Sequence, residues 1–144
     1  MLKAKLDSVR KNKKGFSLVE LIIVIAIMVA LIAVMAPAFV KYVQKSRNSA
    51  LSTAAESLYT AIQTYYGDPD VTPSGDNLTV TVTAEGGKPI TLDWGSTNAS
   101  DKTAVLALAG VDSTKNMGKA TIGFTIEATK SGADYTFKMT SSNV

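Results

Sequence analysis

The sequence predicts an α+β fold in which one long N-terminal α-helix packs on a small C-terminal antiparallel β-sheet. The first observation is an unbroken run of sixteen apolar residues from Leu21 to Ala36. The second is a change after Gly67, where Thr, Ser, Gly, Asn and Asp become frequent and apolar residues alternate with polar ones, which is typical of strands. About 75 residues cannot bury a large core alone. We therefore expect the sheet to be covered by the second half of the helix.

The positive net charge comes from the start of the chain. Residues 1–15 contain six bases and one acid, whereas the rest of the chain contains nine bases and eleven acids. A nucleic-acid-binding domain needs a basic face on its folded part, so no nucleic acid is expected to bind through a basic patch. The chain has no histidine, and no catalytic set, phosphate loop or metal-ligand spacing is visible. The sequence therefore argues against an enzyme and predicts no metal or cofactor.

The apolar run extends from Phe16 to Val40, where Glu20 is the one charge and Ser17 the one polar residue in 25 positions. As a helix this segment is about 37 Å long, which is enough to cross a hydrocarbon core of roughly 30 Å with some tilt. A cleavable secretory signal has a shorter apolar region of about 7–15 residues, so a plain signal anchor is the stronger alternative. The basic residues before the run place the N-terminus in the cytoplasm.

Two residues fit poorly with a passive anchor. An ionisable residue in a membrane helix is a functional hypothesis by default, and this applies to Glu20. Pro37 lacks an N–H group, so the Ala33 carbonyl loses its helical partner and the helix is expected to kink or loosen there.

The same helix is expected to continue to Tyr66, because Gly67, Asp68 and Pro69 form a stop signal. A helix over 17–66 has about fifty residues. Its amphipathic part, 41–66, should place one face on the sheet, with the positions Arg47, Ala50, Ala54, Leu58, Ile62 and Tyr65. Residues 41–144 would then form one head domain.

Four strands are predicted in the head. They cover 78–83, 90–94, 121–127 and 133–139, and a loop over 128–132 joins the last two. The segment 100–109 is ambiguous. A short helix capped by Ser100 or Asp101 and stopped by Gly110 is preferred, with a strand as the alternative.

The basic residues, Gly15, the segment from Phe16 to Glu20, the apolar run and Pro37 together resemble the precursor of a type IV pilin. Pseudopilins of type II secretion and of DNA-uptake machines share this signature. The specific match covers about residues 13–45. The long helix and the terminal sheet resemble the family in architecture only.

The resemblance implies a sequence of processing steps. A prepilin peptidase would cut between Gly15 and Phe16, remove residues 1–15 as a cytoplasmic leader and methylate the new amine of Phe16. An assembly ATPase and a membrane platform protein would then move the subunit from the membrane into a helical homo-oligomeric filament. Residues 16–40 would form the filament core, and Glu20 would act in docking of an incoming subunit.

A physical reason exists for the role of Glu20. Cleavage creates an α-amine at Phe16 with an unperturbed pKa of about 7.7–8.0, so it is largely cationic at neutral pH. In a low-dielectric filament core, Glu20 and the Phe16 amine of a neighbour would compensate each other's burial and select one axial register. The alternative is pairing within one subunit, because the two residues are four positions apart on one helix.

The chain departs from the family pattern in two ways. Many members have a glycine eight residues before the proline, where this chain has Val29, so how far the helix unwinds near Pro37 is open. Many Gram-negative pilins also close a C-terminal loop with a disulfide, which a chain without cysteine cannot form. A Gram-positive source is therefore expected.

Other polar motifs have ordinary explanations. Asp68, Asp70 and Asp76 lack the spacing of an EF-hand, so a solvated turn is favoured over a calcium loop. Two glycosylation sequons begin at Asn77 and Asn98, but such matches are common by chance.

Aromatic and basic residues of the head each have two interpretations. Trp94, Tyr65 and Tyr66 fit packing between helix and sheet, with adhesion as the alternative. Lys41, Lys45 and Arg47 fit anchors at the membrane interface, with salt bridges between subunits as the alternative.

Three functions compete at this point. A pilin of an extracellular filament that serves adhesion, motility or DNA uptake is favoured. A pseudopilin of a secretion or competence system is the alternative, and a signal-anchored surface protein with a small binding head comes third. For the first two, the precursor would reside in the cell membrane, in contact with lipid.

Overall fold

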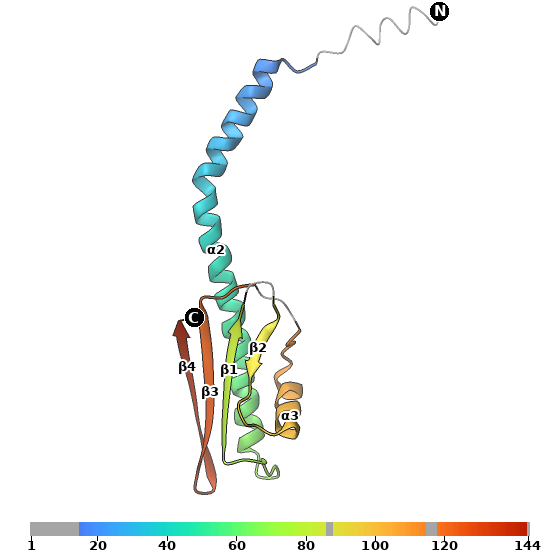
Figure 1. The fold of residues 1–144 in the computed structure, drawn as a ribbon, viewed down its shortest axis with the longest axis vertical. Coiled ribbons are helices and arrows are strands. Elements are labelled where there is room, and N and C mark those ends of the chain that lie inside the picture. Colours follow the sequence, from blue (N-terminus) through green and yellow to red (C-terminus); the bar gives the residue numbers. More distant parts are fainter. Residues whose placement is uncertain (1–14, 86–87, 115–117, 144) are drawn as a thin grey trace, which may run out of the picture. The chain divides into compact units, whose positions relative to one another are not determined.

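A computed structural model describes residues 15–85, 88–114 and 118–143 (Figure 1). The elements follow in the order α2 (Leu18–Gly67), β1 (Asn77–Ala84), β2 (Ile90–Asp93), α3 (Ala99–Ala109), β3 (Ile122–Ser131) and β4 (Asp134–Asn143). The predicted α+β class is confirmed. The chain divides between Val40 and Lys41 into an N-terminal unit, which holds the first part of α2, and a head.

Helix α2 has 50 residues, and its bounds lie within one residue of the predicted ones. No glycine interrupts it before its last residue, Gly67, and Pro69 follows two positions later. Pro37 lies inside the helix and does not end it. The kink expected at Pro37 remains a prediction.

The head contains a four-stranded antiparallel sheet in the order β2-β1-β3-β4. Val80 pairs with Ile126, which pairs in turn with Met139, so these three side chains share one face of the sheet. On this face Val80 and Ile126 are fully buried. The C-terminal part of α2 runs along the sheet (Figure 1) and supplies Leu51 and Leu58 to the same core.

The buried face of α2 differs from the predicted one. Ala54, Leu58 and Ile62 are buried as expected, but Arg47, Ala50 and Tyr65 are only half-buried. The other buried positions are Leu51, Ala55, Ala61 and Tyr66. At the two ends of the contact, the buried positions are therefore one residue later than predicted, with Leu51 in place of Ala50 and Tyr66 in place of Tyr65.

Strands β3 and β4 are longer than predicted, with ten residues each. The loop predicted over 128–132 is wrong, because the ladder continues to the pair Ser131 and Asp134. Gly132 has a φ of 70°, which a tight two-residue turn requires and a side chain would disfavour. The polar residues before the turn hid this extension, since backbone pairing does not need apolar side chains.

The ambiguous segment 100–109 forms α3, so the helix is confirmed and the strand is excluded. The predicted cap is wrong, because Asn98 occupies the N-cap position and makes no side-chain cap bond. Gly110 ends the helix in the left-handed conformation, and its N–H donates to the Leu106 carbonyl. Asp101 lies within the first turn and is 3% exposed. Its carboxylate is therefore buried in the head and does not cap the helix.

Candidate functional site

Two hydrogen bonds that involve the side chains of Ser17 and Glu20 close the first turn of α2. The Ser17 amide donates to a Glu20 carboxylate oxygen over 2.9 Å, and the Val19 amide donates to the Ser17 hydroxyl over 3.3 Å. This is a capping box, in which the residue before the helix and the third helical residue satisfy amides that have no intrahelical partner. The negative charge of Glu20 also lies at the positive end of the helix. The one acid of the apolar segment, Glu20, therefore caps its own helix.

The bond between Gly15 and Phe16 lies just before this cap. Gly15, Phe16 and Ser17 are outside the helix, and the Phe16 side chain is 88% exposed. Because the Ser17 amide belongs to the peptide that follows Phe16, it would be retained if the chain were cut before Phe16. The carboxylate of Glu20 is thus held one residue from the position where a new amine would appear.

Residues 16–40 present an almost wholly apolar surface. The large apolar side chains between Leu18 and Val40 are all at least 50% exposed in this chain. Among the described residues, one helix is long and apolar enough to cross a membrane, and its most apolar window has a mean hydropathy of 3.1. Such a surface needs lipid or other apolar surfaces around it.

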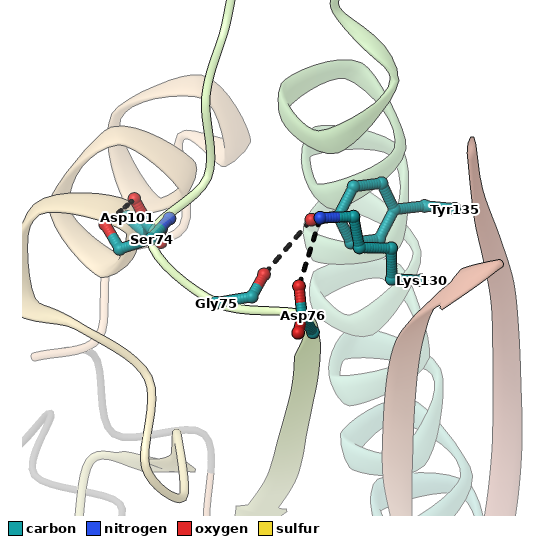
Figure 2. Close-up of polar contacts among 6 residues, drawn as sticks. All are labelled: Ser74, Gly75, Asp76, Asp101, Lys130 and Tyr135. Atoms are coloured by element: carbon teal, nitrogen blue, oxygen red, sulfur yellow. Dashed lines mark hydrogen bonds and ion pairs between the residues drawn. The ribbon is translucent and has the colours of Figure 1, made fainter. Parts of the chain in front are cut away.

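In the head, Asp101 joins three segments. Its carboxylate accepts the Tyr65 hydroxyl at 2.9 Å, the Ser74 amide at 2.9 Å and the Ser74 hydroxyl at 3.2 Å. Tyr65 lies at the end of α2, and Ser74 lies in the loop that leads to β1, where Figure 2 shows it beside Asp101. The pKa of Tyr65 is raised by desolvation and by its hydrogen bond to Asp101. The network fixes the position of the loop over 68–76.

The β3–β4 hairpin holds the same loop from the other side. The Tyr135 hydroxyl donates to the Gly75 carbonyl at 3.0 Å, and the Lys130 ammonium lies 3.1 Å from an Asp76 carboxylate oxygen (Figure 2). This ion pair raises the pKa of Lys130.

The aspartates of the candidate calcium loop make separate contacts. Asp68 accepts the Asp70 amide at 2.9 Å, which is an Asx turn, whereas Asp76 pairs with Lys130. Among the described residues, no group of three or more acidic, histidine or cysteine side chains could hold a metal ion.

The other predicted positions fall in different surroundings. Trp94 and Tyr66 are buried, as the packing interpretation predicts, and both sequon asparagines are exposed. Of the three basic residues after the apolar run, Lys41 and Lys45 are exposed, whereas Arg47 lies against Gly118. The basic residues of the predicted leader lie outside the described part of the chain.

Comparison with known proteins decides what the N-terminal segment is. Residues 10–36 match the family model described as the prokaryotic N-terminal methylation motif. The chain is also 39% identical over 59 residues to the type IV major pilin protein PilA of Myxococcus xanthus, and 39% identical over 75 residues to the fimbrial protein EcpC of Eikenella corrodens. The N-terminal region is therefore similar to that of type IV pilin precursors. The resemblance stated from the sequence is thereby confirmed.

The two alignments cover only part of each protein. They include 41% and 52% of this prepilin-like chain, and 27% of PilA and 48% of EcpC. The chain thus matches less than half the length of these relatives. No solved structure is significantly similar to it.

The prepilin segment contains one functional residue that sequence reasoning missed. Ser17 looks in the sequence like a polar exception in the apolar run, but Ser17 and Glu20 have the Ser-x-x-Glu spacing of a capping box just before apolar residues. Asp101 was also assigned the wrong role, and no local signal could have corrected it, since its donors are 27 and 36 residues away.

Proposed function

We propose that this prepilin-like protein is a structural subunit of a type IV pilus. In this proposal a prepilin peptidase cuts between Gly15 and Phe16 and methylates the Phe16 amine. The subunit then leaves the membrane and polymerises through residues 16–40. The observation that carries the proposal is the methylation motif on a helix whose apolar side chains are exposed along its first half.

The cleavage step is supported by the local structure. A protease needs an accessible, extended peptide, and the described residues before α2 are non-helical and exposed. The capping box explains why the helix does not extend back over Phe16, since the Ser17 amide is already satisfied by Glu20. The scissile bond would thus remain outside the helix.

The assembly step gives Glu20 a second task. In the precursor its carboxylate caps its own helix, and the α-amine of Phe16 does not yet exist. After cleavage the same carboxylate would lie near a cationic amine, either of its own subunit or of a neighbour, and burial in a filament would strengthen either pair. Pairing with the neighbour would select the axial register of the filament.

The relatives favour a pilin over the alternative of a pseudopilin, because both are named as pilus or fimbrial proteins. In the proposal, the precursor is a single-pass membrane protein with a cytoplasmic N-terminus, and the mature form is an extracellular filament. An assembly ATPase and a platform protein are its partners.

Electron microscopy of cells that express or lack the chain tests this function. The proposal predicts surface filaments that are labelled along their length by antibodies to the head and are lost when the gene is deleted. Unchanged filaments without label, combined with head antigen spread over the cell surface, would contradict it and favour the signal-anchored surface protein.

A further inference from the structure

The head has a pocket where the loop after α2 meets the β3–β4 hairpin. Its volume is about 570 Å³, within the usual range of small-molecule sites. Three aromatic side chains, Tyr66, Tyr135 and Phe137, contribute to its wall. The loop side of the pocket is fixed by the bond from Tyr135 to the Gly75 carbonyl and by the Asp76–Lys130 pair. The pocket is therefore built from two segments that are tied together.

Two of the aromatic rings make an edge-to-face contact. The rings of Tyr66 and Tyr135 are 5.1 Å apart between centroids and are inclined at 74°. Tyr66 is 5% exposed, and its ring also packs edge-on against Tyr65. Burial raises the pKa of Tyr66 to about 12, so the phenol stays neutral in any physiological medium. Electron-rich ring faces attract cations, most strongly where water is partly excluded.

The charges around the pocket add to this preference. Asp68 and Asp134 line it and are exposed, and Lys130 is the one base among the lining residues. The Lys130 ammonium is 3.1 Å from Asp76, which is not a lining residue, so its charge is compensated from outside the pocket. The carboxylates of Asp68 and Asp134 are thus the uncompensated charges among the lining residues. Together with the aromatic side chains, they make the pocket complementary to a positively charged ligand.

The geometry points to a binding site for a small alkylammonium group, which would stack on the partly exposed Tyr135 and Phe137 and face the carboxylates of Asp68 and Asp134. This function does not depend on filament assembly, because every lining residue belongs to the head. In a surface-exposed protein the site would provide attachment to trimethylammonium groups, either free or in a lipid headgroup.

Ligand-observed NMR on the full chain in a non-ionic polyoxyethylene detergent tests the site. Choline is the probe, and 3,3-dimethylbutan-1-ol is its neutral isostere, with a carbon atom in place of the nitrogen. We expect saturable binding of choline that is about tenfold tighter than that of the neutral alcohol. Glycerophosphocholine distinguishes the sources: binding comparable to choline assigns a lipid headgroup, and weaker binding assigns a free ammonium ligand.

Matched variants locate the binding. Asp134→Asn should weaken choline binding about threefold to tenfold without affecting the neutral alcohol, whereas Asp93→Asn, a carboxylate elsewhere in the sheet, should change neither. Phe137→Leu keeps an apolar wall and should weaken choline about tenfold. Equal binding of choline and its isostere, no saturable binding to the folded chain, or preferential binding of glucose or N-acetylglucosamine would each overturn the assignment.

Discussion

The Ser17 amide donates a 2.9 Å hydrogen bond to the carboxylate of Glu20, three residues further along the chain. This bond gives the acid in the apolar segment a structural role before any second subunit is present. It also means that removing Glu20 has two consequences, the loss of a helix cap and the loss of a charge. Experiments on this residue need variants that separate the two.

Replacing Glu20 by Gln separates them. A glutamine at this position still offers an oxygen to the Ser17 amide, as in other capping boxes, but carries no charge. If the charge acts in assembly, Glu20→Gln should insert and be cleaved like the unmodified chain but form few filaments. Glu20→Val, which removes both properties, should also be inserted and cleaved and should block filament growth. Counting filaments by microscopy and precursor by immunoblot checks both variants, and normal filaments from either would refute the charge pair.

The cap itself is tested by a matched pair at Ser17. Threonine keeps the hydroxyl that accepts the Val19 amide, whereas valine has nearly the same shape without it. Ser17→Val should destabilise the first turn of α2 by about 1 kcal/mol, and Ser17→Thr should leave it intact. Hydrogen exchange of the Val19 and Leu21 amides in micelles measures this difference. Equal exchange in the two variants would show that the hydroxyl does not cap the helix.

Removing the Asp101 carboxylate should destabilise the head. Asp101→Ala leaves the Tyr65 hydroxyl and the Ser74 amide without their acceptor, at a cost of about 2 kcal/mol. Thermal unfolding followed by the fluorescence of the buried Trp94 reports this loss. The exposed neighbour Lys102→Ala is the control and should unfold like the unmodified chain. A melting temperature equally unchanged in both would refute the structural role of Asp101.

A side chain at Gly118 should destabilise the head for two reasons that can be separated. Its φ is 75°, and a Cβ atom there would lie 2.7 Å from Nε of Arg47. Gly132 has a similar φ of 70° but open space around it, so Gly132→Ala measures the backbone strain alone. Gly118→Ala should therefore destabilise the head more than Gly132→Ala in chemical denaturation. Adding Arg47→Ala should reduce the difference in destabilisation between Gly118→Ala and Gly132→Ala. Equal destabilisation by the two glycine substitutions would contradict the close packing of Arg47.

Alkaline titration provides a test of burial at Tyr66. The folded-state pKa of Tyr66, about 12, lies above the ordinary tyrosine value of 10.0 because of desolvation, with the charge of Asp101 as the next cause. The unfolded chain therefore loses this proton first, so the stabilising contribution is complete below pH 10 and is lost as the pH rises towards 12. Tyrosinate absorbance should show a phenol that titrates near pH 12, later than that of Tyr65, and that disappears in Tyr66→Phe. A Tyr66 that titrates with the exposed tyrosines would contradict its burial.

The sequence predicted those features that are set locally. Apolar periodicity and the Gly67–Pro69 stop signal located α2, and alternation located β1 along Leu78, Val80 and Val82. The cap of α3 was wrong because Asp101 is used by distant partners, and a sequence pattern cannot show which competing hydrogen bond forms. The extension of the hairpin across Thr129 to Ser131 was missed for a similar reason, since backbone pairing leaves no apolar signature there.

The most direct test of the proposed function is the mass of the chain recovered from sheared surface filaments. The proposal predicts a polypeptide that begins at Phe16, carries one methyl group on its N-terminal amine and is the main component of the filaments. Recovery of surface protein that still contains residues 1–15 would contradict both the cleavage and the assembly that depends on it.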